Sequence, residues 1–270
     1  MTNCNMVHLG TSGYSFSDWK GTVYPEKIKP SEMLRYYYSV WNFNSVELNF
    51  TYYRQPSYKS IVGITRKIPG KFTFSVKAPG KVTHELWRNE NNTVAYKTLK
   101  DFFDPLEILK KENRMGVILF QFPYRFHLTK SNIKYLENIC NYCAEKNYKT
   151  AVEFRNVEWA KNSVLKELST NTTPVTVDEP KIGKLFPYIP VKSKNLAYFR
   201  FHGRNLNWFS AEGSERYNYN YSEKDLRRFA NDVLEFLKEG TEVYVYFNNC
   251  YMGQAVNNAL RFRKMLEGEP

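Results

Sequence analysis

The sequence predicts an α/β protein in which residues 1–270 form a single domain, a (β/α)8 barrel of the TIM type. Eight short β-type runs recur with a mean spacing of about 34 residues, the size of one βα unit. Helical patterns lie between most of them, and this alternation favours a parallel sheet closed into a barrel. No linker, repeat or low-complexity tract divides the 270 residues, a length that one barrel commonly occupies.

The expected strands are short runs rich in β-branched, aromatic and other apolar residues. They cover residues 7–11, 45–50, 72–77, 115–122, 150–155, 174–178, 196–202 and 242–248. The expected helices show apolar stripes at helical spacing and cover residues 31–38, 57–68, 94–109, 133–144, 163–169, 226–237 and 254–266. Ser131 is the expected N-cap of the fourth helix, and Ser222 with Asp225 forms a near capping box at the start of the sixth.

One unit departs from the pattern. Between Asp178 and Leu196 three prolines leave room for only a short helix, so we expect the barrel to be irregular or incomplete there. An open doubly wound sheet is the alternative architecture. No Gly-x-Gly-x-x-Gly follows any expected strand, which disfavours a dinucleotide-binding fold, and we predict no cofactor.

In seven of the expected strands an apolar face alternates with a face of polar or aromatic side chains. Val46 and Leu48, for example, oppose Glu47 and Asn49. Period-two geometry places each set on one side of its strand. If the apolar set packs outward beneath the helices, the polar set points into the barrel. Since it falls late in each strand, it would line the C-terminal mouth, where barrel enzymes place their active sites.

This polar set supplies the candidate site residues. Carboxylates and imidazoles serve as general acids and bases, so the candidate catalytic residues are Glu47, Glu153, Asp178 and His202. Cationic and amide side chains can hold an anion, arginine through a bidentate fork. The candidate substrate-binding residues are Asn49, Lys77, His84, Gln121, Arg155, Arg204, Asn248 and Asn249.

A purely structural interpretation is that these charges only neutralise one another inside the barrel. Glu47, Glu153 and Asp178 would then pair with Lys77, Arg155 and Arg200. Buried ion pairs are poor stabilisers because desolvation offsets most of their attraction. A core built for stability alone would use aliphatic residues there, so we favour the functional interpretation.

The overall charge of +12, from 39 Lys and Arg against 27 Asp and Glu, fits an anionic partner. That partner is either a polyanion such as nucleic acid or a small phosphorylated molecule. Aromatic residues are abundant, with 21 Tyr, 19 Phe and 5 Trp, and several follow the expected strands. They either pack the loops as a rim or stack on bases and sugars.

Several features bear on location and metals. The N-terminus has no secretory pattern, and no apolar run approaches the ~18 residues of a membrane span, so we predict a cytoplasmic protein without membrane contact. The four cysteines do not form a disulfide framework. Cys140 and Cys143 lack a second pair at zinc spacing, and the cations expected at the mouth would repel a metal, so we predict no metal site.

Several segments resemble a known family. They include Val46-Glu-Leu-Asn-Phe-Thr-Tyr-Tyr-Arg54 and Phe199-Arg-Phe-His-Gly-Arg204, together with residues 10–25, 74–79, 84–85, 119–123, 151–155 and 244–249. In this order they resemble the YecE-like family (domain of unknown function 72). The resemblance implies a TIM-barrel-like fold and a soluble bacterial or archaeal protein, but no reaction. Cys250 stands where the family pattern leads us to expect a polar residue.

Three functional hypotheses follow. The leading one is an enzyme whose mixed-charge mouth acts on an anionic, phosphate-bearing substrate. An alternative is a nucleic-acid-binding module that uses the same basic, aromatic-rimmed mouth. The third is a carbohydrate-active hydrolase in which Glu47 and Glu153 form the pair of carboxylates. The sequence chooses neither the reaction nor the oligomeric state.

Overall fold

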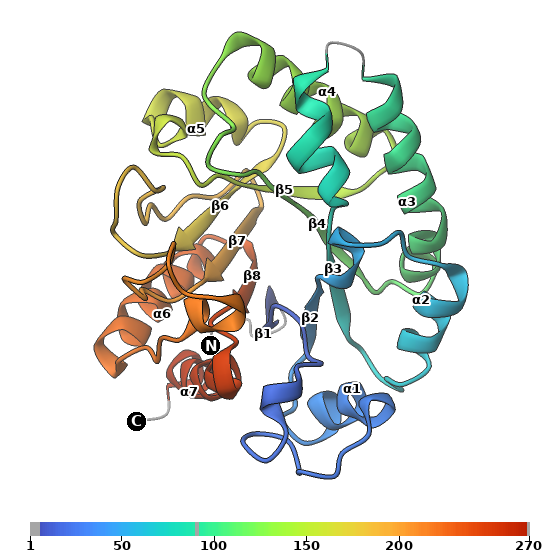
Figure 1. Cartoon of the computed structure of the whole chain (residues 1–270), viewed down its shortest axis with the longest axis vertical. Coiled ribbons are helices and arrows are strands. Elements are labelled where there is room, and N and C mark those ends of the chain that lie inside the picture. The colour runs from blue at the N-terminus through green and yellow to red at the C-terminus, as the bar shows by residue number, and fades with distance from the viewer. Residues whose placement is uncertain (1–5, 90–91, 269–270) are drawn as a thin grey trace.

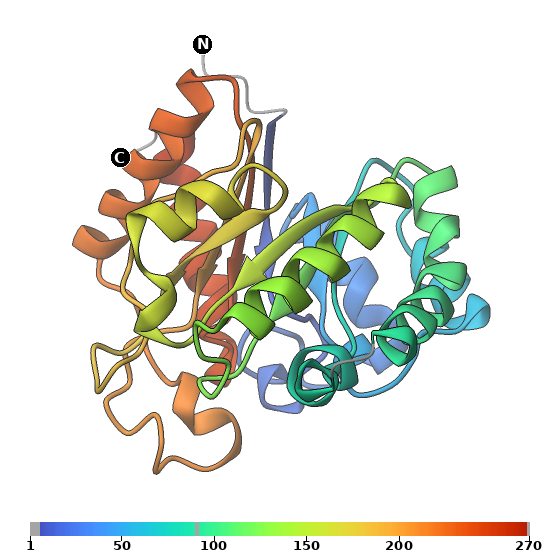
Figure 2. The ribbon, with the colours of Figure 1, turned by 90° about the horizontal axis from the view of Figure 1, so that it is seen from above.

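Eight parallel strands form a nearly closed barrel in the computed structural model, which describes residues 6–89 and 92–268 (Figures 1 and 2). This confirms the predicted fold class. The order around the sheet is β1-β8-β7-β6-β5-β4-β3-β2. The strands are β1 Val7–Thr11, β2 Ser45–Leu48, β3 Thr73–Lys77, β4 Met115–Gln121, β5 Lys149–Glu153, β6 Thr173–Asp178, β7 Leu196–Phe201 and β8 Glu242–Phe247. Each lies within two residues of its expected bounds.

All seven expected helices are present and lie outside the strands (Figure 1). They are α1 Pro30–Ser39, α2 Tyr58–Thr65, α3 Thr93–Lys111, α4 Lys130–Glu145, α5 Asn162–Leu168, α6 Glu223–Lys238 and α7 Gln254–Glu267. The capping box of Ser222 and Asp225 opens α6 as predicted. The expected N-cap of α4 is wrong: Thr129 accepts from the backbone of Asn132, which leaves Ser131 inside the first turn.

The unit between β6 and β7 contains no helix. Its segment crosses the outside of β6 in extended form, where the Val191 N–H donates to Thr176 Oγ1 over 3.0 Å. Earlier in the same segment, the N–H of Phe186 donates to the carbonyl of Arg155. β5 and β6 share only two register pairs, Ala151 with Thr173 and Val152 with Pro174. The barrel is therefore irregular at this side, as expected, although the short helix is absent.

The barrel interior is divided into two levels. The lower level is an apolar and aromatic cluster of Val117, Leu119, Ala151, Val175, Leu196, Tyr198, Tyr244 and Tyr246. The level above it carries buried charged groups from the C-terminal ends of the strands. Because packed side chains fill the lower level, a ligand has access to the interior only from the C-terminal mouth.

Side chains, rather than a strand ladder, close the seam between β1 and β2. Only Ser12 and Glu47 form a β-bridge there. Below it, the hydroxyl of Tyr37 on α1 accepts from Thr11 N–H at 2.8 Å and donates to the Ser45 carbonyl at 3.0 Å. The Asn44 side chain pairs with β1 in the same way, accepting from Leu9 N–H and donating to the Val7 carbonyl. Two side chains thus take the place of backbone pairing.

We predict that Tyr37→Phe destabilises the protein by about 1–3 kcal/mol, because two buried backbone groups lose their partner. Urea unfolding measures the change. Tyr38→Phe is the matched control, since the Tyr38 hydroxyl has no hydrogen-bond partner in the described part of the chain. Equal stability of the two variants would show that the seam does not depend on Tyr37.

Candidate functional site

Arg200 on β7 lies at the centre of the upper level and is only 1% exposed. Its Nη2 donates to Glu47 Oε1 over 2.8 Å, and its Nη1 donates to Glu153 Oε2 over 2.5 Å. The same Nη1 lies 3.1 Å from Gln121 Oε1. One guanidinium therefore joins β7 to β2, β5 and β4 across the barrel.

The two carboxylates held by Arg200 are fully buried. Burial alone would raise the pKa of Glu153, but Arg200 and the neighbouring Arg155 outweigh it and hold that pKa well below its usual range. The other oxygen of Glu47 accepts from the hydroxyl of Tyr198 at 2.7 Å, which links the charged level to the aromatic cluster below. Both carboxylates are fixed in position, and Glu153 is an anion at neutral pH.

His202 at the end of β7 is also fully buried. Its Nε2 lies 3.1 Å from Glu153 Oε1, and its Nδ1 lies 2.7 Å from the amide nitrogen of Asn248. An Asn248 amide that donates to Nδ1 favours a proton on Nε2, directed at Glu153 Oε1, although Arg155 Nη2, which can only donate, lies 3.3 Å from the same Nε2. Burial, followed by the charge of Arg155, lowers the pKa of His202 to about 3, so the ring is neutral at physiological pH.

Arg155 lies between two carboxylates. Its Nε is 3.0 Å from Glu153 Oε1, and its Nη1 forms an ion pair with Glu179. Its guanidinium also lies 5.4 Å from the ring centre of Trp208, which comes from the loop after β7. Burial raises the pKa of Glu179 to about 7 despite the opposing charge of Arg155. Sequence reasoning missed Glu179, although it stands next to Asp178.

Lys77 at the end of β3 is the cation of this cluster that has no carboxylate within ion-pair distance in the described ranges. Its Nζ donates to Gln121 Oε1 over 3.0 Å and lies 4.5 Å from the centre of the Tyr52 ring. It is partly exposed, whereas Glu47 and Glu153 are not. Burial and then the charge of Arg200 lower the pKa of Lys77 to about 7.

Asp178 does not join this cluster, and the expectation that it points into the barrel is wrong. Its carboxylate accepts three hydrogen bonds from Arg204, at 2.8–3.0 Å, and one from Tyr221. Arg204 also pairs with Asp225 at the start of α6. The alternation in β6 predicts that its valines face outward, but Val175 lies in the inner cluster, so the two faces of this strand are exchanged. Asp178 and Arg204 form a separate pair outside the central cluster.

The remaining candidates lie around the mouth. His84 is partly buried beside Tyr52, with ring centres 5.2 Å apart. Asn49 directly follows β2, and its Oδ1 has no hydrogen-bond partner among the described residues. Asn249 instead anchors the loop after β7, because its amide donates to the Tyr219 carbonyl and to Asn258. Of these three, His84 lines a hollow at the mouth, whereas the Asn249 amide is occupied in holding the loop.

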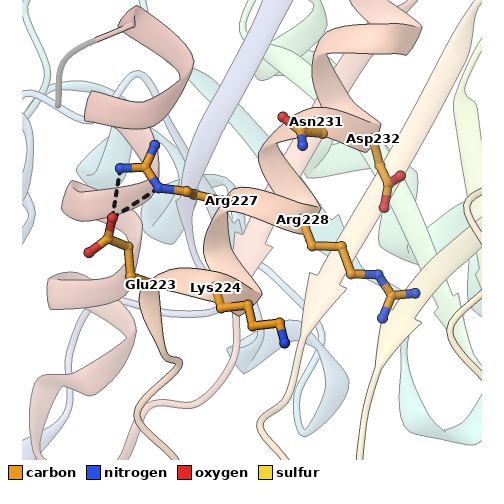
Figure 3. A pocket seen from close by; sticks show the side chains of 6 residues that line it. All are labelled: Glu223, Lys224, Arg227, Arg228, Asn231 and Asp232. Carbon is orange, nitrogen blue, oxygen red and sulfur yellow. Dashed lines mark hydrogen bonds and ion pairs between the residues drawn. The ribbon is translucent and has the colours of Figure 1, made fainter.

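Hollows in the surface flank the β3–β4 side of the mouth. One of about 330 Å³ is lined by residues that include Tyr52, Arg54 and His84. A larger one of about 860 Å³ includes Arg88 and Arg125. A third, of about 610 Å³, is an open depression along α6 on the outside of the barrel (Figure 3). There the Arg227 guanidinium is paired with Glu223, and the lining also includes Lys224, Arg228 and Asp232.

Among the residues with described positions, no three His, Cys, Asp or Glu side chains are grouped so that they could hold a metal ion. Cys140, Cys143 and Cys250 are buried free thiols, and Cys4 lies outside the described residues. Within 6–89 and 92–268, no helix combines the length and apolarity needed to cross a bilayer.

We predict that Lys77→Met raises the melting temperature at pH 7 by a few degrees. The pKa of Lys77 is about 7 in the folded protein and near 10.4 when unfolded, so the folded state binds fewer protons between these values. The buried ammonium group therefore lowers the stability of the folded state at pH 7, and this effect fades toward pH 10. The increase in melting temperature caused by Lys77→Met should fade over the same range. Gln121 Oε1 keeps its contact with Arg200 in the variant.

Thermal unfolding at pH 7 and pH 10 measures this gain, with Lys81→Met, at an exposed lysine beside the same mouth, as the control. A melting temperature for Lys77→Met at or below that of the parent protein at pH 7 would contradict the prediction.

Comparison with known proteins gives the family. The model described as "Protein of unknown function DUF72" matches residues 8–270. UPF0759 protein YunF of Bacillus subtilis is 25% identical, with 98% of this chain and 96% of YunF aligned. The solved structure of the DUF72 family protein TM1631 from Thermotoga maritima is 49% identical, with a TM-score of 0.90 and 97% and 99% coverage of the two chains. EF0366 from Enterococcus faecalis is 27% identical, with a TM-score of 0.82 and 97% and 95% coverage. The match over nearly the whole length shows that this chain belongs to the DUF72 family of unknown function, the family also called YecE-like.

Proposed function

We propose that the protein is an enzyme that acts on an anionic, phosphate-bearing substrate at the C-terminal mouth of the barrel. The observation that supports this most directly is the electrostatic environment of His84. Burial and then the charges of Lys77, Arg125, Arg155 and Arg88 together lower the pKa of His84 to about 4. Four basic side chains therefore act on one partly exposed point of the mouth.

Most of this positive charge is uncompensated. Lys77, Arg88 and Arg125 form no ion pair within the described chain, and only Arg155 is matched by carboxylates. Arg125 Nη2 reaches the backbone carbonyl of His84 at 3.4 Å, so its charge lies directly beside the imidazole. A phosphate group placed on this side of the mouth would find several cations without displacing an existing carboxylate partner.

The acid–base groups differ from those expected from the sequence alone. Arg200 fixes Glu47 and Glu153, and neutral His202 is held between Glu153 and Asn248. Lys77 and Glu179 instead have pKa values near 7, where a group can both accept and donate protons. We assign proton transfer to Glu179, and the positioning of charge to Glu47, Glu153 and His202.

The carbohydrate-hydrolase hypothesis has less support. A glycosidase needs one carboxylic acid that is protonated at working pH and can protonate the leaving oxygen. Here Arg200 bonds to both Glu47 and Glu153, and the pKa of Glu153 is held low. Neither carboxylate is free of its cation.

Nucleic-acid binding is a second candidate because of the aromatic residues on the rim. Tyr53 after β2 and Phe209 after β7 are 85% and 71% exposed, and Tyr124 after β4 is 40% exposed. Exposed rings beside Arg54 and Arg125 suit base stacking. Binding of single-stranded oligonucleotides that weakens steeply with salt, without binding of small phosphates, would favour this candidate over the enzyme.

We predict that Arg125→Gln weakens binding of glycerol 3-phosphate by about 10- to 100-fold, the loss expected for one hydrogen bond to a charged group. Isothermal titration calorimetry measures the affinity. Arg227→Gln removes the same charge from the depression on α6 and should leave the affinity unchanged (Figure 3). Equal effects of the two substitutions would place the anion elsewhere and count against the proposed function.

A further inference from the structure

We propose that the anionic substrate carries a carbonyl group and that Lys77 attacks its carbon, forming an imine between Nζ and the substrate. This inference rests on the proposed function and adds to it both the chemical class of the substrate and the role of one residue.

The position of Lys77 favours this role. Its Nζ donates to the neutral Gln121 Oε1, not to a carboxylate, and the Gln121 side chain is held in turn by Arg200. The amine therefore has a fixed direction without an ion pair that would keep it charged. It is also partly exposed, and its Nζ lies 4.5 Å from the ring centre of Tyr52, which lines the same hollow as His84.

The charged groups that face Lys77 come from several elements. Arg200 on β7 and Arg155 after β5 disfavour its ammonium form, as does burial, whereas Glu153 on β5 and Glu47 on β2 favour it. Burial and the two guanidinium groups prevail, with the carboxylates already bound to Arg200. A lysine that is desolvated beside other cations is activated as a nucleophile because its neutral form is populated at neutral pH.

The step needs no partner beyond the two reactants. The Nζ lone pair forms a bond to the carbonyl carbon, and the π electrons move to the oxygen. A proton passes from nitrogen to that oxygen, which gives a carbinolamine. Loss of the hydroxyl group with the second proton on nitrogen releases water and leaves a C=N bond. The phosphate group of the same molecule would meanwhile be held on the His84 side by Arg125 and Arg88.

The test uses glyceraldehyde 3-phosphate with sodium cyanoborohydride, which reduces an imine to a stable amine, on the full-length protein at pH 7. Peptide mass spectrometry locates and quantifies the adduct. We expect Lys77 to be modified about tenfold faster than exposed Lys81, since the neutral form of Lys77 is populated at this pH. The rate at Lys77 should rise with pH to a plateau with a midpoint near 7.

Glycerol 3-phosphate, which has the same phosphate group but no carbonyl, separates the two proposals. It should slow the modification of Lys77 by competition and leave that of Lys81 unchanged. If it binds in a manner that depends on Arg125 while Lys77 is modified no faster than Lys81, the imine inference is overturned and the proposed function stands. If neither phosphate compound binds, both are overturned. Because Lys77 and Lys81 are compared in the same sample of the unmodified sequence, the test does not depend on whether a Lys77 variant folds.

Discussion

The burial of Arg200 inside the barrel is the constraint on which the site depends. A guanidinium removed from water needs partners that balance its charge and accept its hydrogen bonds. Glu47 on β2 and Glu153 on β5 are these partners inside the barrel. Breaking such a triad would leave an uncompensated buried charge, which costs roughly 3–5 kcal/mol. Replacing a whole triad by well-packed apolar residues is often neutral or stabilising, so stability alone does not explain why this barrel retains it.

The consequence of that central pairing is an uneven distribution of charge. Arg200 and Arg155 take up Glu47 from β2, Glu153 from β5 and Glu179 from the residue after β6. Lys77 on β3 is left with an amide as its partner, and His84 experiences mainly cations. The interior triad thus polarises the mouth, with neutralised charge on one side and accessible positive charge on the other.

The sequence was sufficient to predict the strands, the helices and most of the inward-facing residues, because period-two alternation determines which side chains share a face. Glu47, Glu153, His202, Lys77 and Gln121 do come together. The alternation misled at β6, where Val175 and Asp178 could be assigned to either face, because the lower interior of a barrel is as apolar as its outer layer. Contacts made by loop residues, such as Arg125 beside His84 or Trp208 over Arg155, have no periodicity from which they could be inferred.

The seam between β1 and β2 has a consequence for how the barrel moves. β1 is joined to β8 by five consecutive register pairs, but to β2 mainly through Tyr37 and Asn44. The amides of Leu9 and Thr11 are therefore each hydrogen-bonded to one side chain, Asn44 and Tyr37 respectively. Amide hydrogen exchange at these two positions should report a change of side-chain rotamer, not separation of the strands. Glu47 lies directly above, on the strand that this seam secures. If the contact between β1 and β2 opened locally, Glu47 could move away from Arg200 while the remaining strand pairs stayed intact.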